Sequence, residues 1–406
     1  MAKRDAAALF LISILMMPVA VLVSTNLAEE SVTVSQVQNH IISQYQTSTA
    51  INISGNSEFV SVSASGVGTR SDPYIIENLF ISSSGRSIYV RNTNAYFIIY
   101  NCILESGNSL PAIQFDNVEN GQIILTEIRK RLTTSTSGIQ ISNSQDCLVS
   151  NTSIYGSWNG IHLYSVSNST IANSTLFSNN RGLLFESSSY IQVVNNSIFL
   201  NSNTGLEIWG SSHNNTVYGN TIGWNGQPTW EYESNAVDNG DDNHFDDGIS
   251  VGNAWSDFNG TSPYEIAGSG GAIDSYPELL EDTEDPVILG PSDTVIDVET
   301  SGNTLNWTTF DEFPRSYSLQ IDSGAVAEGR DWNEGDITIG LDSLGVGTYR
   351  YVLTFYDCAG NSASDEVVVT VISFVLGGIG TELVMIASGI TVVCFVVIIL
   401  LIKRLS

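Results

Sequence analysis

The sequence predicts an all-β chain in which stacked coils of short strands come first, a β-sandwich second and one transmembrane α-helix last. Two observations carry this prediction. A short apolar phrase returns at steps of 22 to 26 residues between positions 87 and 226, and an uncharged run of 20 residues ends at Ile402. Self-similarity at a nearly fixed period is typical of stacked repeats. A run of 20 apolar residues has the length that a helix needs to cross a bilayer.

The repeat places aliphatic residues in two columns. The phrase reads Ser-Ile-Tyr-Val in its first copy and Gly-Leu-Glu-Ile in its last. Its second residue forms the first column: Ile88, Ile113, Ile139, Ile161, Leu183 and Leu206. The second column is Ile103, Ile128, Ile154, Leu176, Ile198 and Ile222. Such steps fit three short strands and three turns in each coil, with coils stacked about 4.8 Å apart. Apolar residues alternate at period two between Asn, Ser and Gly, which disfavours helix.

Asparagine recurs just before the second column. The residues concerned are Asn101, Asn151, Asn173, Asn195, Asn196 and Asn220. Stacked coils would place these side chains above one another, where amides can form a hydrogen-bonded ladder. We therefore expect them to have a structural role.

The cysteines do not predict a disulfide framework. The sequence has four, and Cys394 lies in the terminal apolar run. Cys102 and Cys147 fall in different columns of the repeat, so stacking does not bring them together. We expect buried free thiols.

Both ends of the chain carry hydrophobic segments. Lys3 and Arg4 precede an apolar run and then small residues up to Ala28, the pattern of a secretory signal over 1–28. An uncleaved signal anchor is the alternative. At the other end we expect a linker over 374–382, a transmembrane helix over 383–402 and a cytoplasmic tail over 403–406. The basic residues of that tail place it inside the cell, because short basic segments stay in the cytoplasm. This predicts a single-pass type I protein of the cell membrane, with most of the chain extracellular.

The extracellular part is strongly acidic. Without the two ends, 10 basic and 42 acidic residues remain, a net charge of about −32. A field of this sign repels nucleic acid, so we expect no nucleic-acid partner.

Two motifs resemble a known family. Gly68-Thr69-Arg70-Ser71-Asp72-Pro73-Tyr74-Ile75-Ile76-Glu77-Asn78 is similar to the first coil of NosD-like right-handed parallel β-helices, of the pectate-lyase-like superfamily, in archaeal surface proteins. The acidic run 238–248 with Asn253-Ala254-Trp255-Ser256-Asp257-Phe258 resembles the terminal coils of that family. A short acidic segment usual after this motif is missing here. The resemblance implies a right-handed parallel β-helix with an N-terminal lead-in over 29–280.

Residues 281–373 predict a β-sandwich. Alternating strands are punctuated by turn signals every ten or so residues. Gly347-Thr348-Tyr349 and Asp357-Cys358-Ala359-Gly360-Asn361 resemble an immunoglobulin-like repeat of prokaryotic surface proteins. The expected role is a spacer between the β-helix and the membrane.

Calcium is the metal that the sequence favours. Its candidate ligands are carboxylates near a Gly-containing loop, and Ca²⁺ prefers hard oxygen ligands. They are Asp238, Asp241, Asp242, Asp246, Asp247 and Asp257. A solvated acidic loop is the alternative. The resemblance to NosD raises copper as well, but no methionine lies between Met17 and Met385 and the histidines are isolated, so soft and imidazole ligand sets are not in place.

Aromatic residues and sequons suggest a carbohydrate connection. Trp158 and Trp224 are each followed by Asn-Gly, which predicts the same turn three coils apart, about 14 Å. Two rings at that spacing would stack on sugars, or simply cover a turn. Eight Asn-x-Ser/Thr sequons are candidate glycosylation sites: Asn52, Asn151, Asn168, Asn173, Asn195, Asn214, Asn259 and Asn306.

The repeat does not predict a catalytic site. Its charged residues are sparse, and in the sequence they do not line up as columns on one face or as a carboxylate pair about 5–10 Å apart. We therefore predict cell-envelope display with binding of a glycan or another surface, without catalysis. The alternative is a carbohydrate-active enzyme, a polysaccharide lyase or hydrolase acting on acidic sugars.

Overall fold

The computed structural model describes residues 45–107, 109–130, 136–226, 234–322, 327–331 and 337–373. The expected signal peptide (1–28), linker (374–382), transmembrane helix (383–402) and tail (403–406) lie outside these ranges. Within them, no helix has both the length and the apolar character that crossing a bilayer requires.

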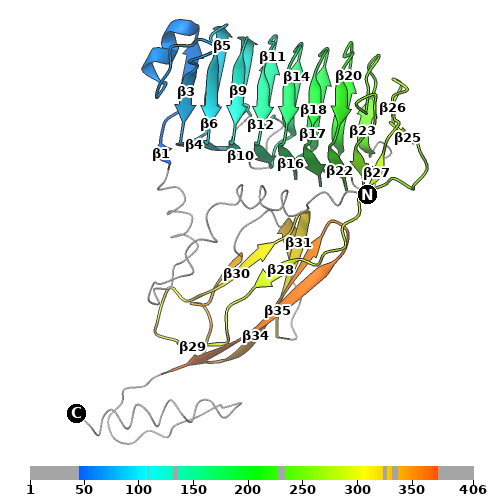
Figure 1. The fold of residues 1–406 in the computed structure, drawn as a ribbon. Coiled ribbons are helices and arrows are strands. Elements are labelled where there is room, and N and C mark those ends of the chain that lie inside the picture. The colour runs from blue at the N-terminus through cyan, green and yellow to red at the C-terminus, as the bar shows by residue number, and fades with distance from the viewer. Residues whose placement is uncertain are drawn as a thin grey trace, which may run out of the picture.

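The N-terminal part is a β-helix of three parallel sheets (Figure 1). Sheet A has ten strands: β1 (Gln46–Thr47), β4 (Leu79–Ser83), β7 (Ile103–Ser106), β10 (Glu127–Lys130), β13 (Ser153–Tyr155), β16 (Thr175–Phe177), β19 (Ser197–Phe199), β22 (Thr221–Gly223), β24 (Ala254–Trp255) and β27 (Glu278–Leu279). Sheet B has eight: β2 (Ile51–Ser54), β5 (Ile88–Thr93), β8 (Ile113–Val118), β11 (Ile139–Ser142), β14 (Asn159–Tyr164), β17 (Arg181–Glu186), β20 (Thr204–Trp209) and β23 (Ser234–Asp238). Sheet C has seven: β3 (Tyr74–Glu77), β6 (Phe97–Tyr100), β9 (Gly121–Ile124), β12 (Leu148–Ser150), β15 (Thr170–Ala172), β18 (Gln192–Val194) and β21 (Thr216–Tyr218).

The first predicted column is confirmed in sheet B. Ile88 pairs with Ile113, and the pairing continues through every member to Leu206. The second column is confirmed in sheet A from Ile128 to Ile222. Its first member was wrong by one residue, because Ile128 pairs with Leu104 rather than with Ile103. Both residues are buried, so hydrophobicity alone does not fix which of them points inward.

Glycine opens four copies of the repeated phrase because the coils approach too closely there for a side chain. A Cβ on Gly182 would lie 2.5 Å from the carbonyl oxygen of Gly205, and one on Gly160 would lie 2.6 Å from that of Gly182. Contacts this short require the neighbouring backbone to move. The strand therefore begins with the smallest residue and continues with a buried aliphatic one.

The asparagines before the second column divide into two roles. Asn101, Asn151, Asn173 and Asn195 adopt positive φ, between 50° and 56°, at the turn between sheets C and A. Asparagine tolerates this left-handed conformation better than most residues. The prediction that these four residues mainly form an amide ladder was wrong, although Asn101 also donates a hydrogen bond to Asn78.

The predicted amide ladder is confirmed at the next position. Asn196 donates to Asn220 and Asn220 to Asn253, and all three are buried. A second ladder joins Asn179, Asn201 and Asn225 at the turn between sheets A and B and continues to Asn235 of β23. This second ladder was not predicted, although Asn179, Asn201 and Asn225 each follow a residue of the second apolar column by three positions.

Aromatic side chains close both ends of the β-helix core. At the N-terminal end the 3₁₀-helix η1 (Asn56–Ser61) inserts Phe59, which stacks on Tyr74 with ring centroids 5.0 Å apart. At the C-terminal end Trp255 stacks on Tyr264, which begins the hairpin of β25 (Tyr264–Glu265) and β26 (Ile273–Asp274). The predicted free thiols are confirmed for Cys102, Cys147 and Cys358, which are all buried.

The C-terminal part consists of two sheets around one core. The first contains β28 (Val287–Leu289), β30 (Thr304–Phe310) and β33 (Ile337–Gly340). The second contains β29 (Thr294–Asp297), β35 (Ser362–Ile372), β34 (Gly347–Asp357), β31 (Pro314–Ile321) and β32 (Ala327–Asp331). Their pairs are antiparallel except β29 with β35, which is parallel. Trp307 of the first sheet and Leu353 of the second share the buried core.

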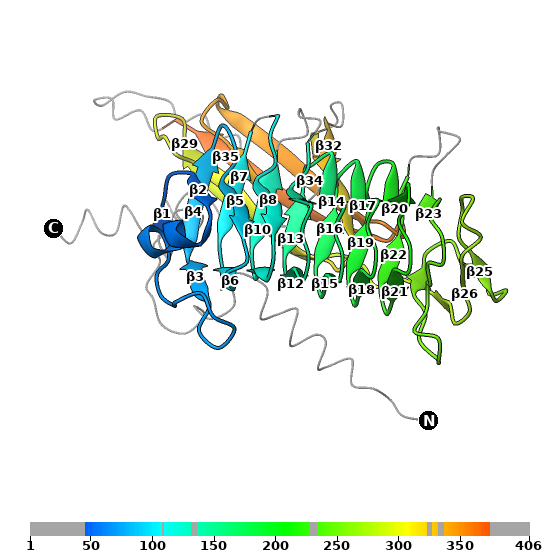
Figure 2. The ribbon, with the colours of Figure 1, turned by 90° about the horizontal axis from the view of Figure 1, so that it is seen from above.

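The C-terminal sheets lie alongside the β-helix (Figures 1 and 2). A separate apolar cluster marks the contact, formed by Phe177 and Phe199 of sheet A with Phe313 and Cys358. Phe177 and Phe199 stack with centroids 5.5 Å apart, and Phe313 meets Phe199 edge-on at 5.3 Å. We call these four residues the docking cluster. It covers part of the outer surface of sheet A.

Candidate functional site

The outer face of sheet B carries two columns of mostly polar and aromatic side chains. Because side chains alternate along a strand, residues between the inward aliphatic ones point outward. The pairing register gives one column as Tyr89, Gln114, Gln140, His162, Leu184 and Glu207. It gives the other as Arg91, Asp116, Ser142, Tyr164, Glu186 and Trp209. Six strands at about 4.8 Å spacing make a strip about 24 Å long.

Trp209 is a rigidly held aromatic surface at one end of this strip. Trp209 is 49% exposed, and its Nε1 donates a hydrogen bond to Glu207 Oε1. The other oxygen of Glu207 pairs with Arg181, and Glu207 is itself buried. A charge-assisted network of this kind fixes the ring orientation before any ligand arrives. An ordered, exposed indole is a suitable surface for an apolar ring face.

Tyr164 shares the column of Trp209, with Glu186 between them. Tyr164 is 46% exposed. The two aromatic residues are two strand spacings apart, about 10 Å. Glu186 Oε2 lies 3.5 Å from His162 Nε2, and burial lowers the pKa of that histidine despite the carboxylate. The face therefore presents two aromatic side chains with an acid and a largely neutral imidazole between and beside them.

Two arginines occupy the other end of the strip. The guanidinium carbons of Arg86 and Arg91 lie 4.7 and 5.5 Å from the ring centroid of Tyr89. Arg86 also donates to Gln114 on the next strand. Cations at these distances are attracted to the face of an aromatic ring. This end of the strip presents positive charge on a strongly acidic protein.

The expectation that charged residues would not gather on one face was therefore wrong. His162, Arg181, Glu186 and Glu207 come from three consecutive strands of sheet B and form two pairs, His162 with Glu186 and Arg181 with Glu207. Their spacing in the sequence is irregular, because Arg181 begins its strand while Glu186 ends it. The pairing register between the strands brings them together, and this register cannot be read from the sequence.

The two tryptophans predicted to share a turn do not occupy equivalent positions. Trp224 has φ 49° and follows β22, at the position that Gly156, Ser178 and Leu200 hold in earlier coils. Trp158 directly precedes β14 and is 43% exposed. The ring of Trp224 packs against Phe313, with centroids 4.9 Å apart. Trp158 therefore remains an exposed candidate for carbohydrate binding, whereas Trp224 packs against the docking cluster.

The six aspartates of the predicted calcium site are not brought together. Among the described residues they form no group of three with oxygens near one another. Asp247 accepts hydrogen bonds from the backbone N–H groups of Ile249, Ser250 and Val251, which lower its pKa. Asp246 accepts from Gly248 and Ser275. These two carboxylates tie the loop to itself and to the hairpin after it.

The other four aspartates lie at separate positions and do not share a site. Asp238 is buried and accepts from Gly240 and Asn243. Asp257 accepts from Asn235 and Tyr264. Asp241 and Asp242 are exposed. The loop holds its shape through hydrogen bonds between carboxylates and backbone or side-chain donors.

The predicted sequons all lie at accessible positions. Asn52, Asn168, Asn173, Asn195 and Asn259 are exposed, and Asn151, Asn214 and Asn306 are partly exposed. Asn151, Asn168, Asn173, Asn195 and Asn214 have positive φ and therefore sit at turns. Their glycosylation stays a prediction.

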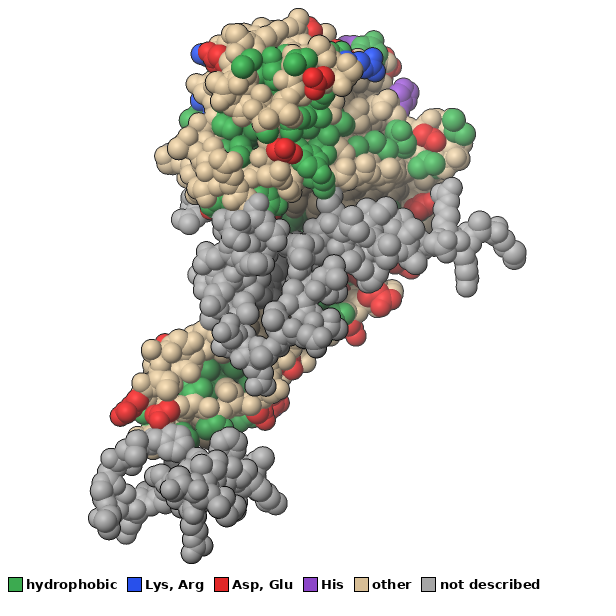
Figure 3. All heavy atoms as spheres, turned by 60° about the vertical axis from the view of Figure 1, so that its left-hand side comes forward, with side chains coloured by type: hydrophobic (Ala, Val, Ile, Leu, Met, Phe, Trp, Pro, Cys, Tyr) green, Lys and Arg blue, Asp and Glu red, His purple; other side chains and the backbone are tan. Residues whose placement is uncertain are grey.

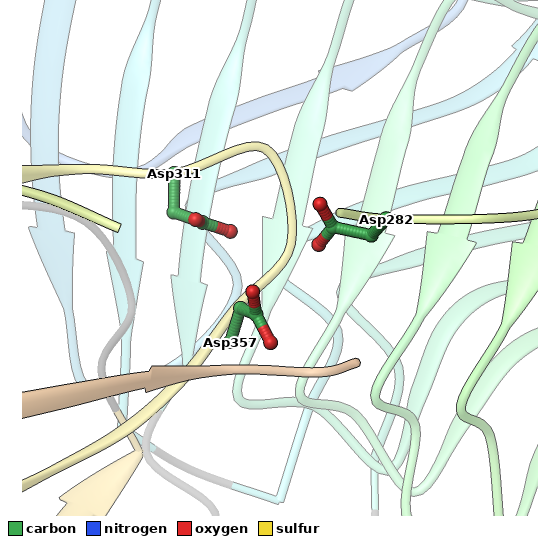
Figure 4. Close-up of side chains that lie close together, drawn as sticks. All are labelled: Asp282, Asp311 and Asp357. Carbon is green, nitrogen blue, oxygen red and sulfur yellow. The ribbon is translucent and has the colours of Figure 1, made fainter. Parts of the chain in front are cut away.

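A different acidic group does assemble, and the sequence did not predict it. Asp282, Asp311 and Asp357 each place a carboxylate oxygen within 4.8 Å of the others (Figure 4). They come from the segment after β27, the turn after β30 and the end of β34. These three aspartates are 29 and 46 positions apart in the chain, so no local sequence pattern indicates that they meet. In the view of Figure 3, carboxylates are spread over the C-terminal sheets, whereas the few visible basic side chains lie on the β-helix.

Comparison with known proteins supports the fold of the first part. Residues 24–222 match the family model described as "Right handed beta helix region", so the parallel coils described above are those of a right-handed β-helix. No curated protein matches the chain.

Solved structures resemble the chain only distantly. The enzymatically active domain of tailspike protein 2 from bacteriophage CBA120 has a TM-score of 0.35 at 10% identity, covering 80% of this chain and 72% of that one. ORF18 of Geobacillus virus E2 has a TM-score of 0.34 at 10% identity, covering 90% and 84%. The periplasmic alginate epimerase AlgG has a TM-score of 0.27 at 15% identity, covering 50% and 61%. Likenesses at this level carry no argument about function.

Proposed function

We propose that this chain is a cell-surface protein that binds glycans on the outer face of sheet B. The observation that carries the proposal is the column in which Tyr164 and Trp209 flank Glu186. Sugar rings offer an apolar face to aromatic side chains and hydroxyl groups to carboxylates and imidazoles. The strip supplies both kinds of partner, in a line along the β-helix.

The arrangement of Trp209 favours binding without large rearrangement. Its indole is already oriented by Glu207, and Glu207 is already neutralised by Arg181. A preorganised site avoids most of the entropy cost of ordering side chains on binding. The outer surface of sheet A is less suitable, because the docking cluster covers part of it.

The proposal includes the cellular location of the protein. We propose a NosD-like surface protein of archaeal type, exported by the signal of residues 1–28 and anchored by residues 383–402. The C-terminal sheets would be an immunoglobulin-like spacer. Their strand orders, β28-β30-β33 and β29-β35-β34-β31-β32, support this, because immunoglobulin-like sandwiches split their strands between two sheets in a similar way. Retention of the full-length chain in the membrane pellet after alkaline carbonate extraction would support the anchor, and its release would contradict it.

A glycan array tests the binding function. Full-length protein would be applied to arrays that include neutral oligosaccharides and their uronate-bearing counterparts. We expect retention on a subset, and at least tenfold weaker retention for Trp209→Ala and for Tyr164→Ala.

Tyr356→Ala is the control, because Tyr356 is exposed to a similar degree on the C-terminal sheets. It should bind as the unmodified protein does. Loss of binding in Trp158→Ala but not in Trp209→Ala would move the site to the turn that the sequence analysis selected. Absence of retention on every glycan would overturn the proposed function.

A carbohydrate-active enzyme is the second candidate, and one observation favours it. Glu186 and Glu207 lie on adjacent strands, two positions out of register, which separates their Cα atoms by about 8 Å. Both belong to the outward columns of sheet B, and glycoside hydrolases use two such carboxyl groups flanking the scissile bond. Release of reducing ends from acidic polysaccharides, lost in Glu186→Gln, would establish hydrolysis. Binding that survives with no turnover would leave the glycan-binding function alone.

A further inference from the structure

Three carboxylates meet where the β-helix joins the C-terminal sheets. Asp282 lies in the segment that leaves the β-helix, while Asp311 follows β30 and Asp357 ends β34 in the C-terminal sheets (Figure 4). Asn361 Nδ2 donates to the backbone oxygen of Asp282 and to Asp357 Oδ2, which ties the two parts together at this point. The three side chains point toward one another.

The negative charge of the group is not paired with a cation among the described residues. Within the part of the chain that the structure describes, no Lys, Arg or His nitrogen lies within 4.0 Å of these carboxylates. Asp357 is completely buried. Burial first, and then the neighbouring acids Asp282 and Asp357, raise the pKa of Asp311 to about 7. Bringing like charges together away from water is costly unless a counter-charge is present.

One oxygen of the group has no partner at all. Asp282 Oδ2 is inaccessible to solvent and receives no hydrogen bond from the described residues. The other two side chains accept hydrogen bonds from backbone N–H groups. Asp311 Oδ1 accepts from the N–H of Phe313, and Asp357 Oδ1 accepts from the N–H groups of Gly360 and Asn361. Buried polar atoms are nearly always satisfied, so this orphaned oxygen, on a side chain that faces Asp311 and Asp357, points to a missing ligand.

We propose that Asp282, Asp311 and Asp357 form a divalent-cation site of the Ca²⁺ type that fixes the C-terminal sheets to the β-helix. The ligand set contains oxygen only, which suits Ca²⁺ and does not suit zinc or copper. Three carboxylates supply part of its coordination shell, and Ca²⁺ accepts water for the remainder. The cation supplies the counter-charge that the group lacks.

The position of the site gives it a mechanical role. Asp311 holds the N–H of Phe313, and Asp357 precedes Cys358. Both of those neighbours belong to the docking cluster. A cation that fixes the two aspartates therefore also fixes the turns that carry the apolar contact. The inference goes beyond the proposed function and does not depend on it.

The experiment measures calcium binding to full-length protein stripped with EDTA. Titration calorimetry with CaCl₂ gives affinity and stoichiometry, and thermal unfolding with and without 1 mM CaCl₂ gives the stabilisation. We expect the unfolding temperature to rise by several degrees on adding Ca²⁺, because a ligand that binds only the folded state stabilises it. Asp282→Asn and Asp311→Asn should each weaken binding at this site at least tenfold. Both side chains are only partly buried, so these variants are expected to fold.

Glu281→Gln is the matched control. Glu281 neighbours Asp282 and is exposed, so this change removes one negative charge without removing a member of the group. It should bind Ca²⁺ and be stabilised as the unmodified protein is. If stripped protein binds no Ca²⁺, or if Asp282→Asn and Asp311→Asn keep the stoichiometry and the thermal shift of the unmodified protein, the inference is overturned.

Discussion

The ring of Phe313 packs on that of Trp224 with centroids 4.9 Å apart, although the two residues belong to different parts of the chain. Trp224 ends a coil of the β-helix, and Phe313 precedes β31 of the C-terminal sheets. Their contact extends the stack of Phe177 and Phe199 along sheet A. This contact uses one outer surface of the β-helix for docking and leaves the outer face of sheet B for a ligand.

Removing the ring of Phe313 should loosen the docking. Phe313→Ala deletes a buried side chain that contacts both Phe199 and Trp224. Truncating a buried phenylalanine costs about 3 kcal/mol or more. We expect one thermal transition to separate into two, with faster proteolysis in the segment 280–286. Tyr356→Ala, an exposed change on the same sheets, should leave both readouts unchanged. An unaltered single transition in Phe313→Ala would show that the docking cluster contributes little.

The stability of calcium-free protein should fall as pH rises from about 4 to 7. The folded-state pKa of Asp311 is raised from 3.8 to about 7, chiefly by burial. The pKa values of Asp282 and Glu312 are also raised, in both cases first by burial. In this interval the folded state binds more protons than the unfolded state, so the free energy of unfolding decreases with pH. Above the folded-state pKa the loss levels off.

Chemical unfolding of EDTA-treated protein at several pH values measures this effect. Asp311→Asn cannot ionise, so its stability should decline less than that of the unmodified protein between pH 4 and 7. Glu281→Gln serves again as the control and should follow the unmodified curve. Parallel curves for the unmodified protein and Asp311→Asn would contradict the assignment.

The buried amide ladder should be a large source of stability. Asn220 donates to Val193 O, Tyr218 O and Asn253 Oδ1, and its own oxygen accepts from Asn196. Asn220→Ala leaves several of these buried groups without partners, at about 1–3 kcal/mol each. We expect a loss of about 3 kcal/mol in the free energy of unfolding, measured with denaturant.

An exposed amide pair provides the comparison. Asn117 donates to Asn92 at the surface and has φ 55°. Asn117→Gly keeps a residue that accepts this backbone conformation, so its cost should stay below about 1 kcal/mol. Equal losses in Asn220→Ala and Asn117→Gly would show that burial does not strengthen the ladder.

The periodic part of the fold could be predicted from the sequence. Ile88, Ile139 and Leu206 occupy one column because every coil meets the same requirement, an aliphatic side chain on the helix axis. The one-residue error at Ile103 arose where two neighbouring residues are both apolar and both buried. Repetition corrects most such ambiguities, because each copy is tested against the next.

The candidate sites could not be predicted in the same way. The group around Trp209 depends on the register between β17 and β20. In this register Glu207 is opposite Leu184, and its side chain pairs with Arg181, which is opposite Thr204. The sequence by itself determined the stacked coils, their buried columns and the acidic character of the chain, because these follow from local patterns that repeat. Only the tertiary structure decided which outer surface is free and where Asp282, Asp311 and Asp357 meet. Contacts between distant segments depend on how separate parts of the chain dock, and no periodicity in the sequence encodes that docking.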